Sequence, residues 1–306
     1  MYIPEKIICV HNGALGDFLQ AWPALYSLTQ NWPQKEFFWA GRSSYSLWTE
    51  PLGFKPCPAE LLASIETLYS SVQWPKTLRE YLVIWFGLQN NPLAVNSEQL
   101  LFLPGLNIDQ GSWLPPRQRF AEQLISKGLF WKADWTEAWK NLICSSALNR
   151  DSDRTLIFPG SGSKAKCWPL ENFLQLGNWL KKDKGQDALF VLGPVERERG
   201  LRVKNFEQVS PKSLSELQNL ISASKLVIGN DCGPMHLTGM LEVPSLTLFG
   251  PTYALQWGPW QGHTIQSAAS CSPCTQVARV SCEQPFCMHK ISLQEVQQYL
   301  LRQNLL

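Results

Sequence analysis

The sequence lacks a sizeable net charge, a long apolar run and any internal repeat. With 27 Lys and Arg against 25 Asp and Glu, its formal net charge is +2. No stretch has the dense Lys/Arg clustering that binding to a phosphate backbone needs, so we expect no nucleic-acid partner. The longest near-continuous apolar run, residues 81–88, is far shorter than the roughly 20 residues of a membrane-spanning helix. We therefore expect at most peripheral contact with a membrane.

The beginning of the chain also lacks a basic region followed by an apolar stretch, so we expect no signal peptide. The expected location is cytoplasmic, where the nine cysteines stay mostly reduced. A length of 306 residues, with 44% hydrophobic and 17% charged residues, is typical of a globular protein of two domains.

Apolar strand patterns alternate with helical patterns along the chain. Alternation of this kind predicts parallel sheets with helices on both faces. A polar run at residues 149–154 places the domain boundary near residue 150, and two α/β domains joined there form a cleft at the carboxyl ends of their strands. The expected strands are residues 6–11, 36–40, 82–87, 155–158, 188–192, 225–228 and 245–249, and the expected helices include 117–129, 171–182, 213–224 and 234–241.

Two stretches of the first domain give weaker patterns. Residues 18–26 have helical spacing, but Pro23 should kink that helix or delay its start. Residues 51–75 predict only loops with short helices.

The stretch Gly229-Asn-Asp-Cys-Gly-Pro-Met-His236 lies between an apolar strand and a helix. Small residues there let backbone N–H groups at a helix N-terminus approach a phosphate, and the helix dipole favours its charge. We assign phosphate binding to this loop, with Asp231 and His236 as hydrogen-bond partners of a sugar or phosphate. The alternative is a tight turn in which Asp231 caps the helix and His236 is a core residue.

A second loop, residues 158–169, also follows a strand directly. It contains a literal G-x-G-x-x-A, the pattern of a dinucleotide site in a dehydrogenase. However, Trp168-Pro169 places the helix start too late, and the next strand has no acidic residue at its tip. Lys164 and Lys166 instead suit a diphosphate. The alternative is a surface loop with two solvated lysines.

A third feature, Gly13-Ala-Leu-Gly-Asp17, ends the first strand. A carboxylate there faces the expected cleft and can take a proton from an acceptor hydroxyl. The alternative role for Asp17 is a helix N-cap, which Asp often provides.

Together these segments resemble glycosyltransferase family 9, the lipopolysaccharide heptosyltransferase family. Their order and spacing match the family across most of residues 5–30 and 155–300, whereas residues 35–150 show almost nothing recognisable. The resemblance is carried by Gly13-Ala-Leu-Gly-Asp17 with Pro23-Ala-Leu25, Lys166-Cys-Trp-Pro169, Leu192-Gly-Pro-Val-Glu-Arg197, Gly229-Asn-Asp-Cys-Gly-Pro-Met-His236, and Phe249-Gly-Pro-Thr252 with Trp257-Gly-Pro-Trp260.

The resemblance implies a GT-B fold, an α/β architecture of two facing Rossmann-like domains with a cleft between them. Residues 1–150 would form the acceptor-side domain and residues 151–306 the nucleotide-sugar-binding domain, whose last helix can pack back on the first. The implied reaction is inverting, metal-independent transfer of heptose from ADP-heptose to a lipopolysaccharide-core or related surface-glycan acceptor, in the cytoplasm or at the inner face of the inner membrane.

The resemblance also implies roles for individual residues. Asp17 would be the general base, Lys166 would neutralise the departing diphosphate, and Glu196 would hold the nucleoside or sugar. The donor-binding residues are Gly13, Gly16, Ser161, Gly162, Lys166, Glu196, Asp231, Cys232, Gly233, Pro234, Met235 and His236.

The chain departs from the family pattern at two places. His11-Asn12 stands where members usually have Arg-Leu, and Cys232 where they have Thr. These departures leave open a GT-B transferase that uses another nucleotide sugar, and an inactive nucleotide-sugar-binding homologue.

Four cysteines, Cys271, Cys274, Cys282 and Cys287, lie in one short segment that contains proline. A C-x-x-C pair followed by two more thiols can hold a structural zinc ion tetrahedrally, but the spacing after the first pair is irregular. Zinc, free thiols and a disulfide all remain open for this segment, and no cofactor is expected for catalysis.

Overall fold

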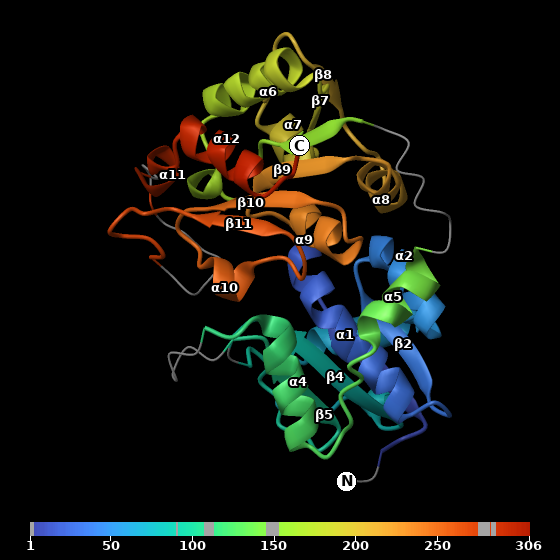
Figure 1. Ribbon diagram of the computed structural model, residues 1–306. Coiled ribbons are helices and arrows are strands. Elements are labelled where there is room, and N and C mark those ends of the chain that lie inside the picture. The colour runs from blue at the N-terminus through green and yellow to red at the C-terminus, as the bar shows by residue number, and fades with distance from the viewer. Residues whose placement is uncertain (1–2, 90, 107–112, 145–152, 275–281, 283–285) are drawn as a thin grey trace. The chain divides into compact units, whose positions relative to one another are not determined.

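The computed structural model describes residues 3–89, 91–106, 113–144, 153–274, 282 and 286–306. The chain divides into two compact units, Met1–Ser145 and Ser146–Leu306, each built on one parallel β-sheet (Figure 1). The predicted boundary at residue 150 lies outside the described residues. Within the described ranges, no helix combines the length and the apolar character that crossing a membrane requires.

The first sheet has the strand order β3-β2-β1-β4-β5, and all neighbours are parallel. The order reverses between β1 and β4, and doubly wound sheets bind ligands at the carboxyl ends of the strands at such a reversal. Both strands are almost wholly buried, as parallel strands covered on two faces should be. The strands are β1 (Lys6–His11), β2 (Glu36–Gly41), β3 (Phe54–Pro56), β4 (Tyr81–Gly87) and β5 (Leu100–Pro104).

The long helix α1 (Leu15–Asn31) packs on α4 (Pro116–Ser126) and α5 (Trp135–Ile143) in front of this sheet in Figure 1. The short α2 (Ser46–Thr49) joins this layer, where the indole of Trp22 donates to the carbonyl of Trp48 over 2.8 Å. On the sheet face that carries Ile8, α3 (Ala59–Thr67) packs through Leu61 and Ile65. The chain's many tryptophans thus build much of this core.

The helix α1 corrects one expectation about Pro23. The helix begins at Leu15 and contains Pro23 within it, so proline does not delay its start. An apolar, almost fully buried helix face from Phe18 to Leu28 supplies packing that stabilises the helix despite the missing N–H of Pro23.

The second sheet has the order β11-β10-β9-β6-β7-β8, again with all neighbours parallel. If the six strands are numbered 1 to 6 in chain order and the sheet is read from β8, the order is 3-2-1-4-5-6. This is the strand order of dinucleotide-binding Rossmann sheets. Its order reverses between β6 and β9. The strands are β6 (Thr155–Phe158), β7 (Ala188–Val191), β8 (Glu207–Val209), β9 (Leu226–Asn230), β10 (Ser245–Phe249) and β11 (His263–Gln266).

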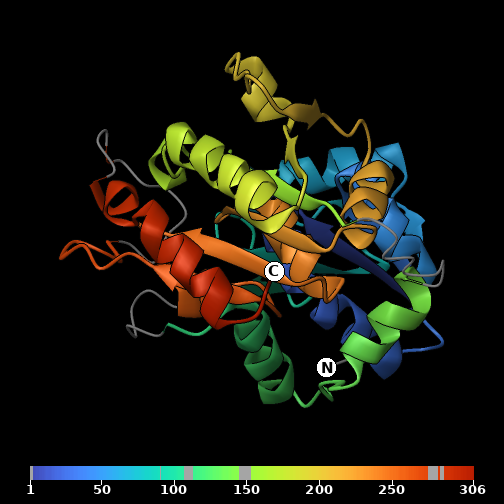
Figure 2. The ribbon, with the colours of Figure 1, turned by 45° about the horizontal axis from the view of Figure 1, so that its top comes forward.

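Helices cover both faces of the second sheet. On one face α6 (Leu170–Lys184) and α12 (Leu293–Arg302) lie side by side in Figures 1 and 2. On the other, α8 (Leu214–Ser222) packs on α9 (Gly233–Met240). Ser213 caps α8, since its Oγ accepts from the N–H of Glu216 over 3.1 Å. The remaining helices are α7 (Pro194–Glu198), α10 (Ala254–Trp257) and α11 (Phe286–Lys290).

The last helix, α12, buries Val296 and Leu300 in the core of the second unit, against α6 and the sheet. The predicted fold class, α/β with two Rossmann-like domains, is confirmed.

Candidate active site

The loops after β6 and β9 meet at the carboxyl edge of the second sheet and are joined by Asn230. This side chain is fully buried. Its Oδ1 accepts from the N–H of Trp168 and its Nδ2 donates to the carbonyl of Pro159, both over 2.8 Å. Trp168 is itself anchored below by an indole hydrogen bond to the carbonyl of Ile291. The loop that carries Lys166 is therefore fixed at the point where the strand order reverses.

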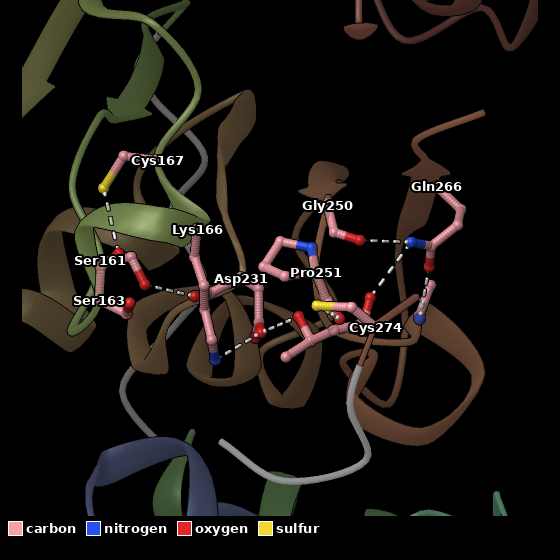
Figure 3. Close-up of polar contacts among 11 residues, drawn as sticks. Ser161, Ser163, Lys166, Cys167, Asp231, Gly250, Pro251, Gln266 and Cys274 are labelled. Carbon is pink, nitrogen blue, oxygen red and sulfur yellow. Dashed lines mark hydrogen bonds and ion pairs between the residues drawn. The ribbon is translucent and has the colours of Figure 1, made fainter. Parts of the chain in front are cut away.

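Lys166 and Asp231 face one another across this edge (Figure 3). The Lys166 Nζ lies 2.8 Å from Asp231 Oδ2, and the two side chains are only 14% and 7% exposed. Thr252, after β10, donates to the same carboxylate oxygen over 2.7 Å. Ser161 donates from its Oγ to the Asp231 carbonyl over 2.8 Å. Of the two predicted lysines, Lys166 is thus an ordered cation, whereas Lys164 is exposed.

Glu196 and Arg199 fix the glycine loop from the side of β7. A Cβ on Gly160 would overlap the Glu196 side chain, so a larger residue there would require Glu196 to move. The Glu196 Oε2 accepts from the N–H of Gly193 over 2.9 Å at the start of α7. Arg199 donates to the carbonyls of Ser161 and Gly162 over 3.0 and 2.9 Å. Glu196 therefore lies against the loop that carries Ser161 and Gly162.

The helix α9 begins at the same edge. Cys232 is its N-cap, Gly233 and Pro234 open its first turn, and Met235 and His236 are buried. Burial raises the pKa of Cys232, so its thiol is protonated at neutral pH. Because Asp231 directly precedes this turn, the positive end of the α9 dipole and the Lys166 ammonium lie at one place. An anion such as a diphosphate suits this arrangement.

The predicted base lies in the first unit, at the reversal between β1 and β4. Asp17 is in the first turn of α1, where its Oδ2 accepts from the N–H of Ala14 over 3.1 Å. It is therefore not the N-cap, which is Ala14, but the acidic residue three positions later. A Cβ on Gly13 would lie 2.9 Å from the Asp17 Cβ, so Gly13 allows this close turn. Gly16 follows in the same turn of α1, and Gly13 and Gly16 belong to the unit of Asp17, whereas the other assigned donor residues belong to the second unit.

Asp17 lines a cavity of about 260 Å³. Its walls come from the ends of β1 and β4, from Gly105 after β5, and from Pro116 and Phe120 of α4. A larger open hollow of about 720 Å³ lies at the opposite, amino edge of this sheet, around Lys6 and Glu80. We favour the smaller cavity as a binding site because ligands of doubly wound sheets bind at the carboxyl edge.

His11, one of the two departures from the family pattern, also lines this cavity. Its side chain is 4% exposed and stacks on Trp39, with ring centroids 6.4 Å apart. Burial lowers the pKa of His11 to about 4, with a further lowering by Arg42. The imidazole is therefore neutral at pH 7, and this wall of the cavity carries no positive charge from residue 11.

The four cysteines of the C-terminal segment lie near one another. Burial raises the pKa of Cys274 and Cys287, and the neighbouring thiols raise both further. No disulfide joins them. The described residues nevertheless contain no group of three or more side chains arranged to hold a metal ion, so the zinc site remains a prediction.

Sequence reasoning missed three residues of this edge. Arg199 and Gln266 donate hydrogen bonds to backbone carbonyls, and no sequence pattern indicates such contacts. Thr252 was noted only as the end of the Phe-Gly-Pro-Thr motif, and its position directly after a strand was the available signal. The dinucleotide alternative fails locally, because a short 3-10 turn at Lys164–Lys166 follows the glycines and α6 starts only at Leu170.

Two doubly wound units, one with a carboxylate at its strand-order reversal and one with a cation and a helix N-terminus, fit a glycosyltransferase of the GT-B type. The family model described as glycosyltransferase family 9 (heptosyltransferase) matches residues 130–285, about half of the chain. The chain belongs to glycosyltransferase family 9.

Known proteins similar to the chain agree with this assignment. It is 25% identical over 292 residues to lipooligosaccharide heptosyltransferase 2 of Campylobacter jejuni, covering 86% of this chain and 87% of the relative. The fold matches that of the E. coli heptosyltransferase WaaC with ADP, with a TM-score of 0.66 and 17% identity over 97% of this chain and 99% of the other. It also matches E. coli ADP-heptose lps heptosyltransferase II, with a TM-score of 0.63 and 16% identity over 97% and 98% of the two chains.

Proposed function

We propose that this protein transfers heptose from ADP-heptose to a lipopolysaccharide-core or related surface-glycan acceptor, by an inverting mechanism that needs no metal ion. The observation that carries the proposal is the Lys166 ammonium, held 2.8 Å from Asp231 beside the first turn of α9. Family membership and the names of the similar proteins support heptose and ADP as the donor's parts. The second unit is the donor side and the first unit the acceptor side.

The carboxyl edge of the second sheet, here called the donor edge, carries Lys166 and the first turn of α9. These groups would stabilise the negative charge that develops on the leaving group. An ammonium carries three N–H donors, so Lys166 can bind Asp231 and still donate to a diphosphate oxygen. As the bond from the anomeric carbon to the diphosphate breaks, negative charge grows on ADP, and Lys166 with the α9 dipole offsets it. The same two groups supply the positive charge that a divalent metal supplies in other transferases.

Asp17 would act as the general base toward the acceptor hydroxyl. In this proposal its carboxylate takes the proton of the attacking hydroxyl while the oxygen of that hydroxyl bonds to the anomeric carbon. Attack on the face opposite the departing ADP inverts the anomeric configuration. Glu196 would hold the nucleoside or the sugar, because it lies against Gly160 at the donor edge.

For the four C-terminal cysteines we propose a structural rather than a catalytic role. They form either a structural zinc site or a cluster of reduced thiols, and zinc analysis of protein purified without a histidine tag distinguishes the two.

A transfer assay tests the proposal. The protein is incubated with ADP-heptose and a heptose-deficient lipopolysaccharide core, with and without EDTA, and the glycan is weighed by mass spectrometry. We expect the mass of one heptose to be gained at the same rate in both samples. Because Lys166 and α9 already provide the positive charge, chelation should change the rate by less than about twofold.

The same assay contains the competing outcomes. UDP- and GDP-linked sugars run in parallel identify a transferase with another donor if only they are consumed. No transfer from any nucleotide sugar, with ADP-heptose still bound, would identify a binding protein without activity and contradict the proposal.

A further inference from the structure

Thr252 completes the arrangement that holds Lys166, although it lies far from Lys166 in sequence. Its side chain is fully buried directly after β10. Its Oγ1 donates over 2.7 Å to Asp231 Oδ2, the same oxygen that accepts from Lys166 Nζ over 2.8 Å. One carboxylate oxygen therefore accepts from both the Thr252 hydroxyl and the Lys166 ammonium.

Thr252 is in turn held by Gln266, at the end of β11. The Gln266 Nε2 donates to the carbonyls of Gly250 and Thr252 over 3.0 and 3.2 Å, and its Oε1 accepts from the N–H of Ala254 over 2.9 Å. Part of this arrangement is drawn in Figure 3. One amide thus fixes the backbone on both sides of Thr252.

The segment after β11 supports the same loop from outside. Ser272 donates to the Gly250 carbonyl over 2.6 Å and accepts from Gln266 over 2.8 Å. The N–H of Cys274 donates to the Pro251 carbonyl over 2.9 Å. Each carbonyl from Gly250 to Thr252 is therefore engaged, and the Thr252 hydroxyl has a defined position.

These hydrogen bonds matter because a lysine ammonium without fixed partners has no single position. Its charge sits on a flexible four-carbon chain, and ordering that chain costs conformational entropy. A carboxylate that can rotate would leave the ammonium in several positions, whereas the Thr252 hydrogen bond restrains the carboxylate in one.

We propose that Thr252 is a positioning residue, which orients the Asp231 carboxylate so that Lys166 meets the donor diphosphate, and that Gln266 holds Thr252 in place. The inference rests on the proposed role of Lys166. It places Thr252 outside contact with the substrate, acting through Asp231.

The test compares Thr252→Val, which keeps the shape but loses the hydroxyl, with Thr252→Ser, which keeps the hydroxyl. Misplacement of a reacting or charge-stabilising group by about 1 Å can cost about 10²-fold in rate, so Thr252→Val should lower kcat by about tenfold or more. Its KM for ADP-heptose should change less than kcat, because the misplaced charge matters most in the transition state. Thr252→Ser should recover most of the lost kcat.

Thr155→Val is the matched control. Thr155 is equally buried and also donates to a side-chain oxygen, that of Gln186 over 3.1 Å, but at the amino edge of the sheet. It should melt at a lower temperature while keeping its kcat. A loss of kcat in Thr155→Val as large as that in Thr252→Val would assign both effects to general stability and overturn the proposal.

A double variant separates this proposal from the proposed function. If Thr252 acts through Asp231 on Lys166, Thr252→Val should lower kcat no further in a Lys166→Ala background. Wild-type kcat in Lys166→Ala would refute the role of Lys166 itself. If Lys166→Ala has a strongly lowered kcat while Thr252→Val has a normal one, only the positioning role of Thr252 is refuted. Should Thr252→Val not fold, Thr252→Ala takes its place in every comparison.

Discussion

Replacing Asp17 with asparagine should abolish most turnover and leave the protein as stable as the wild type. The carboxylate lines the cavity at the reversal of the first sheet, and its Oδ2 accepts from the N–H of Ala14. An asparagine oxygen can accept the same hydrogen bond but cannot take a proton from the acceptor hydroxyl. A general base contributes roughly 10²- to 10⁴-fold, so we expect a loss of that size in kcat for Asp17→Asn.

Melting temperature, donor binding and turnover together distinguish a role of Asp17 as general base from a role only in the first turn of α1. The loss of a helix-end hydrogen bond costs about 1 kcal/mol of stability, which Asp17→Ala should show in its melting temperature and Asp17→Asn should not. Donor binding should be unchanged in both variants, because Asp17 belongs to the acceptor unit in this account. If Asp17→Asn keeps at least half of the wild-type turnover at saturating substrates, a different residue is the base.

Replacing Lys166 with alanine should lower turnover by about 10²-fold or more, as removal of one fixed donor to a developing charge typically does. The same change should weaken ADP binding. It also leaves the Asp231 carboxylate, only 7% exposed, without its cation, so a lower melting temperature should accompany it.

Lys164→Ala is the control for this variant. Lys164 lies on the same loop, two residues earlier, but is exposed. Its removal changes the net charge equally and should leave turnover and ADP affinity near the wild-type values. Equal losses in the two variants would mean that only the loop's overall charge matters, and normal turnover in Lys166→Ala would leave Lys166 with only a structural role as the ion-pair partner of Asp231.

The fold was predictable where strands are buried on both faces. The bounds of β6 and β10 match the expected ranges, because Thr155–Phe158 and Ser245–Phe249 are short, uninterrupted buried runs. The four strands at the outer edges of the sheets, β3, β5, β8 and β11, were missed. Each has three to five residues, of which at most two are buried, so none of them forms a continuous buried apolar run.

The sequence suggested individual residues of the candidate site but not the contacts that join them. Lys166 and Asp231 were each assigned from a loop that follows a strand, yet their ion pair joins positions 65 residues apart. The ion pair forms because β6 and β9 are neighbours in the sheet. Local sequence patterns predict strands but not the order of strands in a sheet. The hydrogen bond from Thr252 depends in the same way on the pairing of β9 with β10.

The measurement that tests the central claim most directly is a crystal structure of the protein with bound ADP. The account predicts that the diphosphate lies at the carboxyl edge of the second sheet, with phosphate oxygens in direct or water-bridged contact with Lys166 Nζ and the first turn of α9. Phosphates more than about 8 Å from both, beyond the reach of a bridging water, would contradict it.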